Sequence, residues 1–164
     1  MAYLLDADAL IEARKRWYGF DFCPAYWDWL VAENAAARVF SIEKISDEIE
    51  VGGDDLSAWA AARGPAFFLK PDAAVLPALR KVSDWATGQD YDAAAVNTFL
   101  QAADYYLVGQ ALAHGHTVVT LELPATSRKK IKIPDACIGL GVKCMSPFDM
   151  LRVSHARFVL ENVP

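Results

Sequence analysis

Short apolar runs alternate along the chain with longer segments in which apolar residues recur at helical spacing. A run this short is typical of a buried strand rather than a helix. Strands that alternate with helices favour a parallel sheet joined by right-handed crossovers. We therefore expect an α/β fold in which helices on both faces enclose a short-stranded parallel sheet, giving three layers, α/β/α.

The pattern places each expected element on a definite stretch of sequence. The expected strands are Tyr3 to Leu5, Arg38 to Ile42, Ala66 to Leu69 at an edge, Val118 to Leu121 and Val142 to Met145. The expected helices are Ala9 to Trp17 with Asp8 as N-cap, Pro24 onwards through Val31, Ile42 to Val51, Leu56 to Arg63, Ala73 to Thr87, a long helix from Ala93 to Ala113, a short turn after Pro134, and Pro147 to Val153. We expect one domain over residues 1–153 and a C-terminal tail over 154–164.

Composition narrows the class of protein. The chain has 164 residues, 54% of them hydrophobic, which is enough for one domain with a sizeable core and excludes intrinsic disorder. Three cysteines without a C-x-x-C pair indicate reduced thiols rather than a disulfide framework or a zinc knuckle. Acids interrupt the first residues where a signal peptide would be apolar, and no stretch is apolar enough for a membrane span, so we expect a cytoplasmic protein.

Two acids follow the first strand directly. Asp6 and Asp8 come after Tyr3 to Leu5, and ligands in parallel α/β folds gather outside the carboxyl ends of the strands. Glu122 follows Val118 to Leu121 in the same way. If the two strands are neighbours, these acids meet on one rim of the sheet, although Asp8 as a helix cap and Glu122 as an ordinary loop charge are open alternatives.

Two further acids lie near the apolar faces of helices. Glu48 is about 90° from the centre of the stripe that Ile42, Ile45 and Ile49 define, closer than the other acids of that helix. Asp104 is only about 50° from the centre of the stripe that includes Leu107. A carboxylate so placed must be protonated, paired, hydrogen-bonded or bound to metal. A structural ion pair for Asp104 and a solvated charge for Glu48 are the competing interpretations.

Together Asp6, Glu48, Asp104 and Glu122 would form an all-oxygen cluster of the kind that Mg²⁺ or Mn²⁺ prefers. Asp135 follows Pro134 and ranks below them, because it can simply cap the next turn. His114 and His116 lack the spacing of metal ligands and are interpreted as loop residues. The sequence therefore predicts a hard divalent cation and gives no support to zinc.

These motifs, in this order, resemble the PIN-domain family of metal-dependent nucleases, which includes the VapC-type toxins of bacterial toxin-antitoxin pairs. The resemblance covers nearly the whole chain, and its later part is similar to one less-characterised PIN-like subfamily. It is carried by Tyr3 to Asp8, Ser41 to Ile49, Ala103 to Leu107, Val118 to Glu122, Ile133 to Cys137 and Ser146 to Leu151. Asp8 stands where many PIN domains carry Asn, and Glu122 where many carry Asp, but all remain oxygen ligands.

The resemblance implies a PIN-like fold and a Mg²⁺- or Mn²⁺-dependent ribonuclease that hydrolyses RNA phosphodiester bonds as the toxin of a type II toxin-antitoxin pair. It also implies that Asp6, Glu48, Asp104 and Glu122 are catalytic metal ligands, that Asp8 supports them, and that the partners are RNA, a cognate antitoxin and a second copy of the chain. Two basic clusters are candidates for steering RNA towards acids that would otherwise repel it, although either could be a solvated charge run. They consist of Arg14, Lys15, Arg16, Arg128, Lys129, Lys130 and Lys132.

Two other functions are compatible with the sequence. Asp6-Ala7-Asp8 copies the nucleophile and acid of haloacid-dehalogenase-like phosphatases, but the later motifs of that family are not found. Alternatively, the chain is a catalytically silent PIN scaffold that binds a partner through the aromatic segment from Trp17 to Trp29. A phosphorylated Asp6 would favour the phosphatase, and the absence of cleavage would favour the scaffold.

Overall fold

The computed structural model describes residues 1–161 and consists of a central parallel sheet with helices on both sides. The strands are β1 (Tyr3–Leu5), β2 (Val39–Ile42), β3 (Phe68–Leu69), β4 (Thr117–Val119) and β5 (Cys144–Met145). They pair in the order β3-β2-β1-β4-β5, and every pair is parallel. The expected α/β class with a short-stranded parallel sheet is confirmed, and it is consistent with a PIN-like fold.

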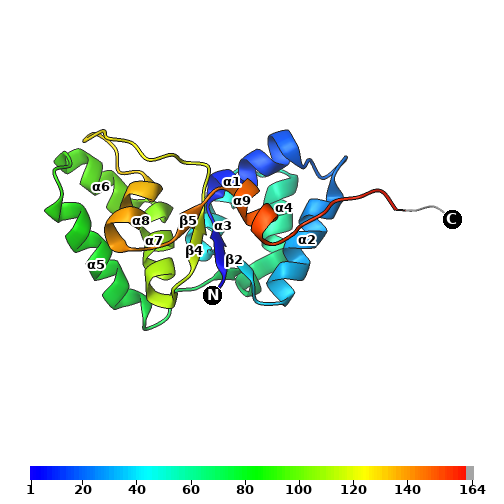
Figure 1. The fold of residues 1–164 in the computed structure, drawn as a ribbon, viewed down its shortest axis with the longest axis horizontal. Coiled ribbons are helices and arrows are strands. Elements are labelled where there is room, and N and C mark those ends of the chain that lie inside the picture. The colour runs from blue at the N-terminus through cyan, green and yellow to red at the C-terminus, as the bar shows by residue number, and fades with distance from the viewer. Residues whose placement is uncertain (162–164) are drawn as a thin grey trace.

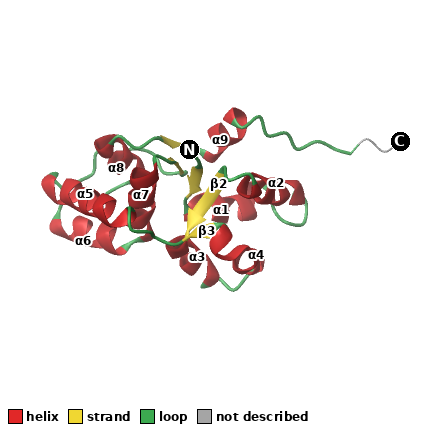
Figure 2. Ribbon diagram, turned by 90° about the horizontal axis from the view of Figure 1, so that it is seen from below, coloured by secondary structure: helices red, strands yellow, loops and turns green. Residues whose placement is uncertain are grey.

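The helices account for most of the remaining chain. They are α1 (Ala7–Glu12), α2 (Pro24–Ala35), α3 (Glu43–Glu50), α4 (Asp55–Arg63), α5 (Val75–Gly88), α6 (Ala93–Gln101), α7 (Ala103–His114), α8 (Ile133–Leu140) and α9 (Pro147–Val153). A π-helical turn (Ala13–Trp17) extends α1, and a 3₁₀ turn (Gly64–Ala66) precedes β3. Helices α5 to α8 lie on one side of the sheet, and α1, α2 and α4 lie on the other (Figures 1 and 2).

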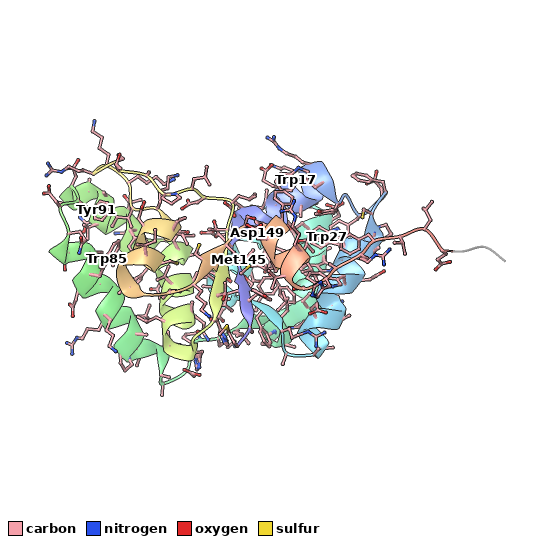
Figure 3. The ribbon with its side chains drawn as sticks, in the orientation of Figure 1. Trp17, Trp27, Trp85, Tyr91, Met145 and Asp149 are labelled. Atoms are coloured by element: carbon pink, nitrogen blue, oxygen red, sulfur yellow. The ribbon has the colours of Figure 1, made fainter. Side chains whose placement is uncertain are left out.

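Burial on both faces explains why the central strands are apolar throughout. Leu4 and Leu5 of β1 and Val118 and Val119 of β4 are completely buried. A parallel sheet covered by helices has no solvent face, so its strands carry no alternation of polar residues. Aromatic side chains fill both helical layers, with Trp85 and Tyr91 on the α5 side and Trp17 and Trp27 on the other (Figure 3). The core therefore spans both faces of the sheet.

The first helix begins two residues earlier than its sequence pattern predicts. Asp6, and not Asp8, is the N-cap, and its side chain accepts a hydrogen bond from the Ala7 N–H at 2.7 Å. Asp8 lies within the first turn instead. The interpretation of Asp8 as the N-cap is therefore wrong, because a single residue, Asp6, separates β1 from α1.

The expected long helix over residues 93–113 is in fact two helices. Ala102 has an extended backbone, with φ −88° and ψ 159°, and separates α6 from α7. Its side chain gives no sequence signal for a break, and tertiary packing decides the outcome because both helices pack against α5. As a result Asp104 lies in the first turn of α7, and the continuous apolar stripe through Leu100 and Leu107 does not exist as one helical face.

Other local predictions agree with the structure. Asp54 and Ser57 form a reciprocal capping box at the start of α4, in the segment expected to separate two helices. β3 is an edge strand, and α9 covers the residues expected for the last helix. No helix or strand follows α9 in residues 154–161. In this segment Phe158 packs against Tyr18. Residues 162–164 of the expected tail lie outside the described residues.

No helix within residues 1–161 is long and apolar enough to cross a bilayer. The cysteines Cys23, Cys137 and Cys144 are all free thiols, and only Cys137 is fully buried. Both findings agree with the expectations from composition.

Candidate acidic site at the carboxyl edge of the sheet

Strand register brings the first acid beside a residue that the sequence pattern did not single out. Leu5 of β1 pairs with Val119 of β4, so the next residues along, Asp6 and Thr120, are neighbours. The Thr120 hydroxyl donates to Oδ2 of Asp6 at 2.8 Å and accepts from the Glu122 N–H at 3.1 Å. Thr120 thus follows β4 directly, as Asp6 follows β1.

The prediction that Glu122 directly ends its strand is therefore wrong. β4 stops at Val119, and Glu122 lies three residues farther on. Its Oε2 accepts a hydrogen bond from the N–H of Ile133, the first residue of α8, at 2.8 Å. Glu122 therefore stabilises the start of α8, where no side chain of the N-cap residue does so.

Asp8 also points towards the end of β4. Its Oδ1 accepts from the Leu121 N–H at 3.3 Å, and the Thr120 hydroxyl lies 3.4 Å from its other oxygen. Asp6 and Asp8 consequently share Thr120 as a neighbour. Asp8 therefore lies beside Asp6 at the end of β4, although it is not a cap.

Asp6 is almost fully buried, with 6% of its surface exposed. Burial, followed by the negative charges of Asp8 and Asp104, raises the pKa of Asp6 well above its ordinary value, and the hydrogen bond from Thr120 opposes this effect. An acid with a raised pKa gains most from a cation, because a cation removes both the desolvation cost and the repulsion. The charge environment of Asp6 therefore favours a bound cation.

The pKa of Asp104 depends on the charges of other acids of the site. Burial raises its pKa to about 6, and the charges of Glu122 and Glu48 add to the rise, while Lys130 opposes it. The charges of Glu122 and Glu48 thus raise the pKa of Asp104, and the charge of Asp104 raises the pKa of Asp6. The break at Ala102 also places it at the amino end of α7, where the helix dipole favours a negative charge.

Glu48 is more exposed than its helical angle suggested. It lies on the solvent side of α3, yet partial desolvation of its carboxyl group raises its pKa, and a backbone hydrogen bond from Ala103 opposes the rise. This contact ties the end of α3 to the start of α7. Glu48 is thus a peripheral member of the site and not an acid at the core edge.

Donor chemistry and donor geometry give different answers about a metal ion. The four acids are hard oxygen donors, and within residues 1–161 neither Asp6 nor Asp104 has a Lys or Arg at ion-pair distance. However, no three His, Cys, Asp or Glu side chains in that range are arranged closely enough to hold one ion. The charges fit a divalent cation, whereas the side chains do not form a closed ligand shell.

Comparison with known proteins gives the family. Residues 3–158 match the family described as Domain of unknown function (DUF4411). The chain belongs to this family. No curated protein and no solved structure matches it. The DUF4411 match includes every acid of the site, but its description carries no activity.

The basic residue clusters of this DUF4411 protein are partly occupied by ion pairs. Arg14 contacts Asp55 at 2.6 Å and Asp54 at 3.4 Å, and Arg16 pairs with Glu12. Lys15 is exposed. The first cluster therefore serves mainly to join α1 and its extension to neighbouring acids.

The second cluster lies closer to the acids. Arg128 donates to the Asp90 carboxylate at 2.8 Å, and Lys132 lies 4.0 Å from Glu122. Lys129 and Lys130 are exposed and line a pocket together with Asp104. This cluster sits on the loop of residues 120–132, which crosses the top of the molecule from β4 towards α6 (Figure 1).

Of the lower-ranked candidates, Asp135 accepts a hydrogen bond from the Ala125 N–H at 3.1 Å and so fixes the same loop to α8. His114 pairs with Asp72 at 3.0 Å, and His116 Nδ1 accepts from the Ala2 N–H at 3.1 Å. Both histidines lie at the opposite, amino edge of the sheet. The interpretation as loop residues is correct for His116 and wrong for His114, which is the last residue of α7.

Proposed function

We propose that the protein is a metal-dependent endoribonuclease of PIN-like type that hydrolyses RNA phosphodiester bonds. The observation that carries the proposal is the group of acids at the carboxyl edge of a parallel sheet, where buried Asp6 lies beside Asp8 and Thr120. Burial raises the pKa of both Asp6 and Asp104, and the charges of Asp8 and Asp104 add to the rise at Asp6, as those of Glu122 and Glu48 do at Asp104. Buried acids whose pKa is raised in this way are typical of functional sites. The order of the motifs, which resembles that of PIN domains, supports the same assignment.

In this proposal Asp6 and Asp104 would hold a Mg²⁺ or Mn²⁺ ion, and Glu48 and Glu122 would complete or orient its ligand shell. When bound, the ion polarises a phosphate oxygen and lowers the pKa of an attacking water. Thr120 and the Ala7 N–H fix the orientation of Asp6 through hydrogen bonds of 2.8 and 2.7 Å. Asp8 accepts a hydrogen bond from the Leu121 N–H and so helps to fix the end of β4 beside Asp6.

The positive charges on the loop of residues 120–132 offset the repulsion between the acids and the phosphate groups of an RNA backbone. Lys129, Lys130 and Lys132 lie beside Asp104 and Glu122, and they are the better candidates for phosphate contacts because the arginines near α1 are already paired. A chain with a net charge of −5 needs such a local basic patch to bind RNA. We further propose that the protein is the toxin of a toxin-antitoxin pair in the cytoplasm. A cognate antitoxin would cover this edge of the sheet, and two copies of the chain would form a homodimer.

One observation favours a second function, a binding scaffold without catalysis. The acids do not form a ready ligand group within residues 1–161. A silent PIN-like scaffold would keep the fold and the acids while losing the ligand geometry. The phosphatase alternative is less favoured, because the later motifs of that family are not found in the sequence.

The test is RNA cleavage by the purified chain without other proteins. Structured and unstructured RNAs are incubated with Mn²⁺ or EDTA, using wild type, Asp6→Asn and Asp104→Asn, with Asp47→Asn on the exposed face of α3 as the matched control. The proposal expects Mn²⁺-dependent cleavage by wild type and the control, and none by the two site variants. Equal cleavage by all four proteins identifies a contaminant and rejects the assignment of the site. No cleavage by any protein supports the scaffold.

A further inference from the structure

A pocket of about 240 Å³ lies directly beside the acidic site. One wall is α6, the other is the end of the loop of residues 120–132, and Asp104 lies at the margin where the pocket meets the acids. The lining residues are Ala94, Ala95, Thr98, Phe99, Ala102, Asp104, Lys129, Lys130 and Ile131.

Small side chains on one face of α6 create the hollow. Ala94, Ala95 and Thr98 are spaced so that they lie on the same side of the helix, and none reaches far towards the loop. The deeper residues are larger, since Phe99 and Ile131 are buried with 3% of their surfaces exposed. The pocket therefore has an apolar base and α6 wall and a mouth open to solvent.

The opposite wall is held in place by three contacts. Arg128 donates to the Asp90 carboxylate at 2.8 Å, and its carbonyl accepts from the Asp92 N–H at 3.0 Å. Asp135 holds Ala125 at 3.1 Å on the other side of the loop. Lys129 and Lys130 follow Arg128 directly, so their backbone is fixed at the pocket. The walls do not need to fold around a ligand before it can bind.

The three parts of the pocket differ in chemistry. The α6 wall consists of small, mainly apolar side chains, because the Thr98 hydroxyl group is hydrogen-bonded to the Ala94 carbonyl group. The loop wall carries the ammonium groups of Lys129 and Lys130, and Asp104 adds a carboxyl group. An anionic group joined to a flat apolar ring satisfies the first two parts at once. A nucleotide is such a ligand, with a base that packs on aliphatic side chains and a phosphate that binds lysine.

We propose that this pocket is a subsite for one unpaired nucleotide of the RNA substrate, next to the phosphate that is cleaved. Its base lies against Ala94, Ala95 and Thr98, and its phosphate binds Lys129 and Lys130. A base in a duplex would first have to be unpaired and unstacked, so an unpaired base enters the pocket more readily. The subsite rests on the proposed ribonuclease function and adds to it a preference for single-stranded RNA and a place where the base is selected.

The test measures binding separately from cleavage. A fluorescein-labelled unpaired RNA and the same sequence as a duplex are titrated in EDTA, and fluorescence anisotropy gives each Kd. Ala94→Phe fills the mouth of the pocket, and Asn97→Phe is the matched control, because Asn97 is also exposed on α6 but does not line the pocket. Lys130→Gln removes one ammonium group, with the exposed Lys143→Gln as its control.

We expect unpaired RNA to bind Ala94→Phe about tenfold more weakly than wild type, as for loss of one base contact. We expect a similar loss for Lys130→Gln, together with a salt dependence reduced by about one phosphate contact. Both controls should stay within about twofold of wild type. Unfolding curves of each variant verify that the fold is retained, and Lys130→Gln decides the question if Ala94→Phe does not fold.

The subsite is overturned if wild type binds no RNA, if it binds the duplex as tightly as the single strand, or if Ala94→Phe and Lys130→Gln bind like their controls. Failure of the proposed function gives a different result. If wild type cleaves nothing but Ala94→Phe still weakens binding, the subsite stands and the nuclease assignment falls. If wild type cleaves RNA while Ala94→Phe changes neither affinity nor cleavage position, the nuclease assignment stands and the subsite is rejected.

Discussion

The hydroxyl group of Thr120 donates to the carboxyl group of Asp6 across the β1–β4 boundary at 2.8 Å, and it simultaneously accepts from the N–H of Glu122. One side chain thus joins the end of β1 to the loop that carries both Glu122 and the lysines. The hydrogen bond also opposes the rise in the pKa of Asp6. Thr120 is the residue on which the orientation of the site depends.

Replacing Thr120 with Val should therefore loosen this corner of the site. Both hydrogen bonds are lost, and a buried carboxyl group is left with one donor fewer, so we expect the free energy of unfolding to fall by about 1–3 kcal/mol. Urea denaturation measures this change. Thr120→Ser keeps the hydroxyl group and is the control, expected to lose much less. A Thr120→Val variant as stable as wild type would show that the two hydrogen bonds do not stabilise this part of the site.

The raised pKa of Asp104 predicts a pH-dependent stability. In the unfolded chain the carboxyl group loses its proton near its ordinary pKa of 3.8, but in the folded protein it does so near a pKa of about 6. The folded state binds more protons between these values, so stability falls as the pH rises from about 4 to about 6 and levels off above that range. Removing the charge should remove this loss.

We accordingly expect Asp104→Asn, in EDTA, to become more stable than wild type as the pH rises through this window, by about 1–3 kcal/mol at pH 7. Urea denaturation at several pH values between 4 and 8 measures it. Asp47→Asn, an exposed position on α3, is the matched control. A stability difference that does not grow between pH 4 and 6 would show that Asp104 is not repelled by its neighbours.

A divalent cation should reverse this destabilisation. An ion that binds only the folded state raises the free energy of unfolding by about 2.7 kcal/mol at one hundred times its Kd. Mn²⁺ should therefore raise the melting temperature of wild type and of Asp47→Asn by several degrees, and should leave Asp6→Asn and Asp104→Asn unchanged. Differential scanning fluorimetry with Mn²⁺ against EDTA measures the shift. An equal shift in all four proteins would place the ion elsewhere.

Gly139 in α8 packs against Trp85 of α5, and a Cβ atom there would overlap the indole nitrogen. Gly139→Ala should consequently separate α8 from α5 and lower stability by about 1–3 kcal/mol. Gly88→Ala is the control, because a Cβ atom at the end of α5 meets no neighbouring atom within 4 Å. Thermal unfolding of the two variants checks the difference. If Gly139→Ala unfolds like Gly88→Ala, Trp85 moves aside without cost.

The sequence by itself determined the elements whose signals are local. Tyr3 to Leu5 is recognisable as a buried strand because it is apolar and short, and Pro24, Gly52 to Asp55 and Pro147 mark helix ends through backbone constraints that act within a few residues. The two acids after β1 were also visible, because they follow the apolar run directly in the sequence. These features need no knowledge of distant residues.

Only the tertiary structure decided which residues meet. The pairing of Leu5 with Val119 places Thr120 beside Asp6, and a β-branched residue that fits a strand pattern gave no sign of that role. The break at Ala102 followed from packing against α5, and it moved Asp104 from a helix interior to a helix start. Register and helix docking depend on contacts between residues far apart in the chain, so the pattern along the sequence does not contain them.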